Sequence, residues 1–430
     1  RMRLVARRVS GRMVRSGRRH DERMSNQITD SLEYLAREMG YVVKYDAAGN
    51  PSYFVEFFKC KSSDLDSSLP DHVHPAFRHG PNTEDDSILI GAYMGSELEP
   101  NGTLYSLPLR PPRVNITYDD ARTGMNAFDA KTTGLTIADH GLILLMAKKY
   151  GWVPKGNNNW SVDYRDGTPW ETGKAVTTGV KRVFRGWMYE CLQAHTTSAS
   201  LLPDASPLRW KKGEKVGGTP VASQYSADNQ YRGYNTLTGS GPASWTLGGK
   251  PGGLVDIQGN AFEQVYGYRL VNLELQIIPD NEVADPACDQ SDSSSKWRAI
   301  KPGATADDYT LVAPGTEGTL HWTWANDKIT LDTVEPTLDG QARGTSFKDY
   351  AVNAANVQAV PSILYELGIM PLSGDTTQGY GYYYFGASVR VPRRGGPCNT
   401  MNNAGLGFLH CSNMRSSANV SYSLRPRSRR

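Results

Sequence analysis

The sequence has 430 residues, enough for one large hydrophobic core or for two to three ordinary domains. Hydrophobic residues make up 39% of it and charged residues 21%, and 23 tyrosines and 9 tryptophans accompany 43 glycines and 25 prolines. This composition is typical of a globular protein with many turns, and it excludes a disordered chain, a collagen-like chain and a plain helical bundle.

The net charge of +3 is unevenly distributed. Nine arginines against Asp21 and Glu22 give residues 1–23 a charge of +7, and four arginines add +4 in residues 425–430, so residues 24–424 carry a charge of −8. An acidic body is a poor partner for phosphate backbones, and we expect it to bind no nucleic acid. Residues 1–23 are interpreted as a basic leader, disordered or artefactual.

The cysteines are too widely spaced for a zinc knuckle or a redox pair, and we expect free thiols. They are Cys60, Cys191, Cys288, Cys398 and Cys411. The longest apolar run, residues 142–147, is far shorter than the roughly 20 residues that span a bilayer. The sequence therefore predicts no membrane insertion, and residues 1–23 lack the apolar region of a secretion signal.

The first predicted element is an amphipathic helix from residue 25 to Gly40. Its apolar residues recur at helical spacing, and they are Ile28, Leu32, Leu35 and Met39. This helix packs on a core or serves oligomerisation or docking, and residues 24–100 are assigned to such a region. Further along, His72, His74 and His79 lie in a loop-like stretch, where surface or structural roles are favoured over metal binding.

Residues 136–150 form the clearest predicted helix. Thr136 and Asp139 have the spacing of a capping box, two lysines suit the C-terminal end of the helix dipole, and Gly151 ends it. Residues 151–160 and 236–253 are rich in Gly, Asn and Trp, a composition typical of long surface loops.

The second half of the chain predicts mainly β structure. Alternating and β-branched residues indicate strands at 265–278, 308–312, 319–331 and 379–392, and residues 286–307 are loop-like. A short helix is predicted at residues 360–368.

Motifs for catalysis are absent from the sequence. It contains no H-E-x-x-H, P-loop or G-x-S-x-G pattern, and the glycines at 239 and 241 precede a proline, as in a turn. We therefore predict no enzyme, no catalytic residue, no metal site and no cofactor.

Three stretches together resemble a known family. In residues 237–281 the positions of a G-x-x-D-x-x-G-N-V-W-E-W signature are matched by Gly253, Asp256, Gly259, Asn260 and Glu263, whereas Phe262 and Gln264 replace the tryptophans. Residues 105–121 with the helix from Thr136 resemble the family's core helix and the stretch before it. Residues 394–425 resemble a variable repeat, with matches at Arg394-Gly395-Gly396, Ala404-Gly405-Leu406, Leu409, Ser416 and Arg425.

These stretches resemble the formylglycine-generating-enzyme-like branch of the C-type lectin fold, in the form of the variable proteins of diversity-generating retroelements. The resemblance implies an α+β, C-type-lectin-like domain over residues 101–425, with a β-rich insertion at about 285–350 and a small N-terminal region. It also implies a variable display segment at 394–425. The segment departs from the repeat at Cys398, Gly407, Cys411, Ala418 and 422–424.

Within this segment, Leu409 and Cys411 alternate with Phe408, His410 and Ser412, which predicts one inward and one outward face. Glycines hold the backbone, so outward positions can vary without loss of the core. The predicted ligand-binding residues are Pro397, Asn399, Thr400, Asn402, Asn403, Gly407, Phe408, His410, Ser412, Asn413, Ser417, Asn419, Val420 and Ser421. Alternatively, the asparagines are simply turn residues.

The resemblance implies a display protein that binds a ligand, such as a receptor-binding protein for host attachment on a phage tail or from a prophage. Its expected partners are a cell-surface receptor, protein or glycan, further copies of itself and other virion proteins. One alternative is a virion structural or decoration protein. Another is an oxidase of the formylglycine-generating type, for which Cys398 and Cys411 are the candidate copper ligands.

Overall fold

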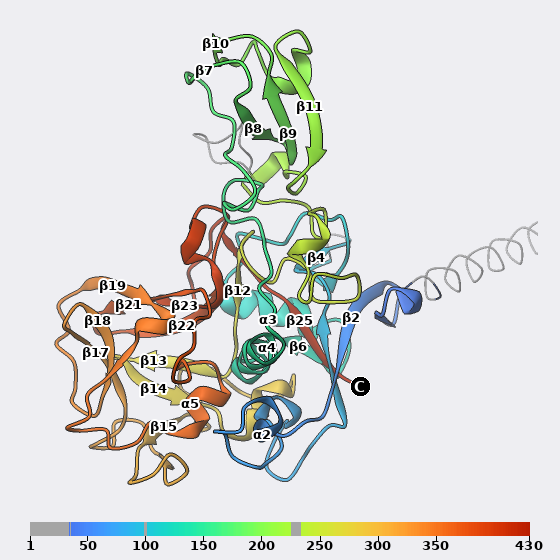
Figure 1. Cartoon of the computed structure of the whole chain (residues 1–430). Coiled ribbons are helices and arrows are strands. Elements are labelled where there is room, and N and C mark those ends of the chain that lie inside the picture. Colours follow the sequence, from blue (N-terminus) through green and yellow to red (C-terminus); the bar gives the residue numbers. More distant parts are fainter. Residues whose placement is uncertain (1–33, 35, 99–100, 225–233) are drawn as a thin grey trace, which may run out of the picture.

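Strands dominate the architecture. The computed structural model describes residues 34, 36–98, 101–224 and 234–430 (Figure 1). Strands form 32% and helices 16% of the structure, in several sheets that do not close. Globular proteins average about 30–35% helix, so the predicted α+β, C-type-lectin-like fold is wrong and the fold is β-rich. The prediction extended the fold implied by short motifs to residues 101–425, whereas the stretches between those motifs form hairpins and loops.

The largest sheet contains thirteen of the described strands. Its main path runs β19 (Gln341–Ser346), β21 (Tyr380–Phe385), β23 (Gly405–Asn413), β22 (Val389–Gly395), β13 (Tyr268–Val271), β14 (Glu274–Ile277), β17 (His321–Ala325), β18 (Lys328–Asp332) and β20 (Ala351–Val352). Attached to this path are β12 (Phe262–Gln264), β24 (Tyr422–Ser423), β15 (Arg298–Lys301) and β16 (Thr310–Val312).

Several strand predictions are confirmed by this sheet. The hairpins β13–β14 and β17–β18 occupy the predicted ranges 265–278 and 319–331, and β16 lies within 308–312. The range 379–392 holds two strands, β21 and the start of β22. The range 286–307 was predicted to be a loop but contains β15, because the polar residues around this strand hide its β pattern in the sequence. Much of the predicted insertion at 285–350 therefore pairs directly with the main sheet through β14.

A second, antiparallel sheet joins the two ends of the described chain. Its order is β1 (Val42–Tyr45), β2 (Pro51–Phe58), β3 (Ser87–Gly91), β25 (Pro426–Arg429) and β6 (Thr132–Gly134). Beside it lies the hairpin of β4 (Gly95–Glu97) and β5 (Leu104–Ser106). Because β25 lies between β3 and β6, its Arg427 is fully buried and its guanidinium donates to Ala76 O at 3.0 Å. Arg425 and Arg427 are thus structural residues and not part of a free basic tail.

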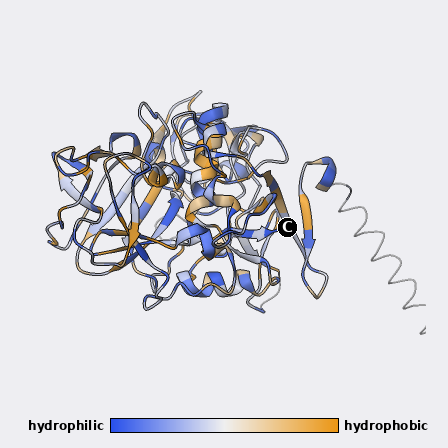
Figure 2. Ribbon diagram, turned by 90° about the horizontal axis from the view of Figure 1, so that it is seen from below, coloured by the Kyte–Doolittle hydropathy of each residue, from blue (hydrophilic) through white to orange (hydrophobic). Residues whose placement is uncertain are grey.

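The central helix is α4 (Ile137–Tyr150), as predicted. Thr136 and Asp139 form the capping box, and Gly151 ends the helix with a left-handed φ of 65°. Most of α4 is buried at the middle of the molecule, where its ribbon is largely hydrophobic (Figure 2). A Cβ on Gly141 would lie 1.9 Å from Glu366 O, so only glycine allows this helix to approach α5 so closely.

The other helices among the described residues are short. They are α2 (Ser62–Leu65), α3 (Tyr118–Asn126) and α5 (Ser362–Glu366), with 3-10 helices at η1 (Pro75–Phe77), η2 (Pro203–Ala205), η3 (Ala222–Gln224), η5 (Ala243–Trp245), η6 (Pro279–Ala284), η7 (Phe347–Asp349) and η8 (Met401–Asn403). The position of α5 confirms the short helix predicted at 360–368.

A small lobe projects from the body between residues 162 and 217, which form a bridge at its base (Figure 1, green). It contains β7 (Ala175–Val176), β8 (Lys181–Phe184), β9 (Trp187–Cys191), β10 (His195–Thr196) and β11 (Trp210–Lys215). Its own core consists of Trp170, Val176, Phe184, Tyr189, Cys191 and Trp210. No pattern in the sequence predicted this lobe.

Most of the helix predicted from residue 25, and all of the basic leader 1–23, lie outside the described residues. Of that helix, residues 36–38 are helical, and Gly40 follows with a φ of 83°. Region 24–100 also supplies β1, β2 and β3, so it shares a sheet with the C-terminal β25.

Candidate functional site

A buried ion cluster holds both ends of the predicted display segment. Glu263 on β12 is 1% exposed and accepts hydrogen bonds from Arg394 Nη1 at 2.6 Å and from Arg425 Nε at 2.7 Å. Both guanidiniums are fully buried. Arg425 also donates to Gly91 O and Val255 O, each at 2.7 Å. One carboxylate therefore fixes the residue at which the segment begins and the residue at which it ends.

Another signature residue, Asn260, ties distant loops together beneath the segment. Its Oδ1 accepts from Thr236 N at 2.7 Å and from Asn157 Nδ2 at 3.1 Å, and its Nδ2 donates to Thr236 O at 3.1 Å. Its φ of 65° lies in the left-handed region that Asn tolerates better than most residues. The side chain thereby connects β12 with the chain that enters and leaves the lobe.

Asp256 is the third such residue. It is 1% exposed, and its Oδ2 accepts from Gly239 N at 2.7 Å. Burial raises the pKa of this carboxyl to about 6, against the opposing effect of the Gly239 amide and of Arg425. Together with Glu263 and Asn260, it shows that the signature residues organise the scaffold.

The segment itself runs along one side of the body, beside the base of the lobe (Figure 1, red). From β22 it passes through a loop with η8, then through β23, a second loop and β24 to β25. Gly395 and Gly396 have φ values of 84° and 81°, which turn the chain sharply out of β22. Gly405 lies so close to Gln378 that a Cβ would be 2.1 Å from its carbonyl oxygen.

Main-chain atoms of the segment are hydrogen-bonded to residues outside it along its whole length. These bonds join Cys398 O to Trp160 N (2.8 Å), Met401 N to Asn158 O (2.9 Å), Gly407 N to Gln378 O (2.9 Å), Ser412 O to Arg390 Nη1 (3.0 Å), Arg415 O to Tyr118 N (3.1 Å), Asn419 O to Asn115 N (2.9 Å), Val420 O to Asn235 Nδ2 (2.7 Å) and Ser421 O to Phe262 N (2.8 Å). Since these bonds use the segment's backbone, they do not depend on which side chains it carries.

The structure places the predicted ligand-binding residues in three groups. Asn399, Asn402, Asn403 and Asn419 are exposed; Thr400, His410, Ser412, Asn413, Ser417 and Val420 are half-buried; Pro397, Gly407, Phe408 and Ser421 are buried. Asn399, Asn402 and Asn403 make no side-chain hydrogen bond with any described residue, whereas Asn419 Oδ1 accepts from Ser421 N at 2.8 Å. The exposed residues lie in the two loops that flank β23.

The strand between these loops has two packed faces. Leu409 and Cys411 point inward and are fully buried, as predicted, but Phe408 is only 3% exposed because it packs with Phe262 and Tyr422. Gly407 is confined too, since a Cβ there would lie 2.5 Å from the ring of Phe347. Positions 407 and 408 are therefore covered by neighbouring aromatic side chains.

His410 completes the aromatic cluster at the edge of this surface. Its ring centroid is 4.9 Å from that of Phe262 and 5.3 Å from that of Tyr382. Burial and the neighbouring Arg393 guanidinium lower the pKa of His410, so its imidazole is neutral at pH 7. It can therefore offer neutral hydrogen bonds, and Asn413 Nδ2 lies 3.1 Å from its Nδ1.

Tyr382 and Tyr384 of β21 were missed by the sequence analysis. They lie on the same side of the sheet as His410 and are half-buried, and the Arg390 guanidinium stands 4.2 Å from the ring centroid of Tyr384. Alternation in Tyr-Gly-Tyr-Tyr-Tyr-Phe could have indicated this face, but the sequence could not show that β21 pairs with β23.

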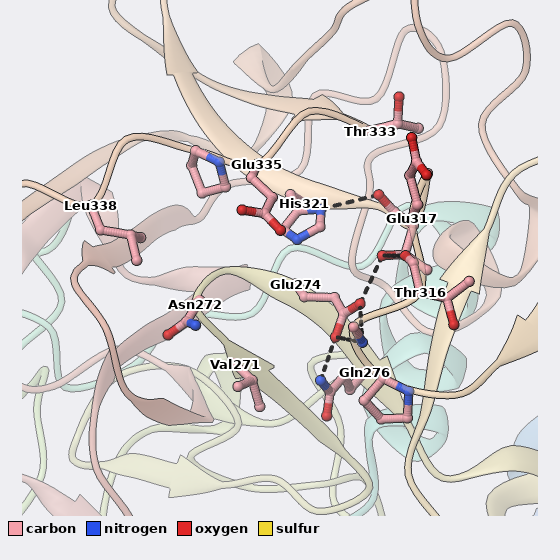
Figure 3. Close-up of a pocket in the computed structure, with 15 residues that line it drawn as sticks. Val271, Asn272, Glu274, Gln276, Thr316, Glu317, His321, Thr333, Glu335 and Leu338 are labelled. Carbon is pink, nitrogen blue, oxygen red and sulfur yellow. Dashed lines mark hydrogen bonds between the residues drawn. The ribbon is translucent and has the colours of Figure 1, made fainter.

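A separate pocket of about 630 Å³ lies at the other end of the sheet, between β14, the 314–319 loop and residues 333–338 (Figure 3). Glu274 Oε1 accepts from Thr319 Oγ1 at 2.7 Å and from Gly315 N at 2.9 Å, and Oε2 accepts from Gln276 Nε2. Glu274 thus holds the loop in place. The lining includes Glu317 and Glu335 but neither Lys nor Arg, which disfavours anionic ligands.

The candidate metal-binding and redox residues have structural surroundings. His72 Nε2 lies 2.6 Å and His74 Nε2 3.0 Å from oxygens of Glu366, and His79 pairs with Asp85. No group of three or more His, Cys, Asp or Glu residues in the described part of the chain is arranged to hold a metal ion.

All five cysteines are free, in agreement with the sequence analysis. Cys398 and Cys411 are fully buried, and burial raises the pKa of both thiols. A cysteine binds copper or attacks a substrate as its thiolate, so these surroundings oppose both roles.

No family model matches this chain, and no curated protein is found to be similar to it. Among the described residues, no helix combines the length and the apolar character needed to cross a bilayer.

Replacing Glu263 by glutamine will test the ion cluster. The variant keeps the size of the side chain but leaves two buried guanidiniums without a countercharge, so we expect a loss of about 3–5 kcal/mol in the free energy of unfolding. The measurement is chemical denaturation followed by circular dichroism. Asp119→Asn is the control, because its pair with Arg415 is largely exposed on the Asp119 side and should contribute less than about 1 kcal/mol. Equal effects of the two variants would contradict the central role of Glu263.

The raised pKa of Asp256 predicts a specific pH dependence. Because the folded state holds this proton more tightly than the unfolded chain, the stability it contributes is present below about pH 4 and is lost as the pH rises through about 6. Asp256→Asn should therefore become more stable relative to the wild type between pH 4 and pH 7, by up to about 3 kcal/mol. Asp71→Asn should show the opposite slope, and only below about pH 4, because hydrogen bonds from Ser63 and Lys61 lower the pKa of Asp71. Parallel curves for the wild type and Asp256→Asn would contradict the prediction.

Proposed function

We propose that this chain is a ligand-binding display protein, and that it serves as a receptor-binding or host-attachment protein of a phage or prophage. The observation that carries the proposal is the way the segment 394–425 is held. Scaffold residues bind its main chain, while Asn399, Asn402 and Asn403 are exposed and contribute no side-chain hydrogen bond to the described fold. Such a surface can exchange its contact residues at little cost in stability.

The resemblance of residues 394–425 to a variable repeat supports the further proposal that a diversity-generating retroelement alters this segment. The packing supports dividing this segment into positions that can vary and positions that cannot. Loop residues can vary freely, but larger side chains at Gly407 would meet Phe347, and Phe408 and Ser421 are buried. The half-buried residues His410, Ser412 and Asn413 lie between the two loops and can contribute contacts at the centre of the surface.

We propose a host cell-surface molecule as the ligand, and self-association of the chain to multiply weak contacts. A binding role is favoured over catalysis because the two cysteines that an oxidase would need are buried as protonated thiols. A virion structural or decoration role is the alternative, and under it the exposed asparagines would be covered by a neighbouring subunit.

Substitution of the exposed asparagines tests the display role. We expect Asn399→Ala/Asn402→Ala/Asn403→Ala to lower binding to host cells at least tenfold, because a few residues carry most of the binding free energy of such interfaces. Its melting temperature should stay close to that of the wild type, since exposed substitutions change stability by less than about 0.5 kcal/mol each. Binding of labelled protein to cells is measured by flow cytometry.

The matched control is Ser67→Ala/Thr337→Ala, which alters exposed residues elsewhere that make no side-chain hydrogen bond with the described chain. Unchanged cell binding by the triple variant would contradict the display role. A triple variant that binds normally but no longer assembles into particles would favour the decoration role.

Sequencing the locus in many copies of the genome tests diversification. We expect a near-identical repeat and a reverse-transcriptase gene nearby, with differences confined to adenines of the repeat. The varying codons should concentrate at exposed positions such as Asn399, Asn402 and Asn403 and spare Gly407 and Phe408, where the packing leaves no room. An invariant segment without such a repeat would leave a binder of fixed specificity.

A further inference from the structure

A second, smaller pocket of about 190 Å³ opens next to the display segment, between the end of α4 and the loop before β21. Its lining includes Trp152, Val153, Gln258, Asp375, Gln378 and Leu406. Only Leu406 belongs to the display segment, so the pocket is built almost entirely from the scaffold. Pockets for drug-sized ligands measure roughly 300–1,000 Å³, and this one has room for a single small ring or side chain.

Three buried polar atoms of the lining have no partner among the described residues. Asp375 is 7% exposed; its Oδ1 accepts from Thr377 N at 2.8 Å, but its Oδ2 is unpaired. Gln258 is 2% exposed with an unpaired Nε2, and Gln378 has an unpaired Oε1 although its Nε2 donates to Tyr164 Oη at 3.2 Å. Each such atom costs about 1–3 kcal/mol unless something binds it.

Part of the remaining wall is apolar and is formed by Trp152, Val153, Pro154 and Leu406. The ring of Trp152 stacks on Tyr150 with centroids 4.9 Å apart and an interplanar angle of 26°. Tyr150 is 52% and Val153 67% exposed, so large apolar surfaces are left in water at the rim. Apolar groups grouped at the mouth of a pocket indicate a binding surface rather than scattered exposure.

The lining offers no unpaired ammonium or guanidinium to an anionic ligand. Its one ammonium, that of Lys148, lies 2.9 Å from Asp66 Oδ2 and is paired there, while Asp375 contributes one carboxylate. An anion is therefore disfavoured in this pocket. A hydroxyl can both donate to Asp375 Oδ2 and accept from Gln258 Nε2.

We propose that this pocket binds one neutral sugar ring, whose C–H surface packs on Trp152 and whose hydroxyls pair with Asp375, Gln258 and Gln378. This site is independent of the proposed display role, because it is formed by residues outside the variable positions. Leu406 borders both the pocket and the display segment. Every variant of the segment would therefore have the same glycan contact next to contacts that differ between variants.

The test uses the full chain and four probes, the methyl glycosides of glucose, galactose, mannose and N-acetylglucosamine. We expect saturation-transfer NMR to detect at least one of them at millimolar concentration. Asp375→Asn should weaken that binding at least tenfold, because asparagine keeps the acceptor for Thr377 N but replaces Oδ2 by a donor. Trp152→Leu should abolish the signal by removing the aromatic wall.

The triple asparagine variant of the display segment and Ser67→Ala/Thr337→Ala are the controls, and both should bind the glycoside as the wild type does. The proposal is overturned if none of the four glycosides gives saturation transfer, or if Asp375→Asn binds as tightly as the wild type. It is also overturned if tetramethylammonium occupies the pocket in place of the glycosides, since that result would assign a cation to Asp375. Loss of cell binding with intact glycoside binding would separate this site from the display role.

Discussion

The bridge from Glu263 to Arg394 and Arg425 is the interaction on which the proposed display surface depends. Burying three charges is costly, and it is tolerated only because each guanidinium meets the same carboxylate and, for Arg425, two backbone carbonyls. The two arginines enclose the whole segment, so its ends are fixed to one point of the scaffold. The path of the chain between the two arginines is therefore set by this ion cluster and by hydrogen bonds to its main chain.

In the proposed display role, this arrangement separates stability from recognition. Side chains that determine the fold, such as Asn260 and Asp256, are buried. Asn399, Asn402 and Asn403, in contrast, are exposed in a loop that the scaffold holds by its main chain. The separation is incomplete, because Phe408 belongs to an aromatic cluster and cannot vary without disturbing Phe262 and Tyr422. The proposed ligand-binding surface therefore consists of two loops with a half-buried strand between them.

Local patterns predicted local elements well. The capping box at Thr136 and the alternation in 319–331 gave α4 and the β17–β18 hairpin, since both depend on residues close in sequence. The predicted fold class was wrong because the fold depends on how strands that lie far apart in the sequence assemble into sheets. The lobe around Trp170 and Trp210 was missed for the same reason, and so was the pocket at Asp375 and Gln258, whose lining comes from separate segments. The signature around Glu263 was noticed, but its partners became visible only in three dimensions.

The position of β25 has a consequence for how the molecule is made. Ile90 of β3 and Thr133 of β6 both pair with Arg427, so their strands share no bond until a residue near 427 has left the ribosome. During most of synthesis these two strands present unpaired edges, which invite aggregation. Closure across so long a stretch of chain is also slow, because its entropy is lost before the contacts form. We therefore expect folding in the cell to depend on protection of the nascent chain until β25 arrives.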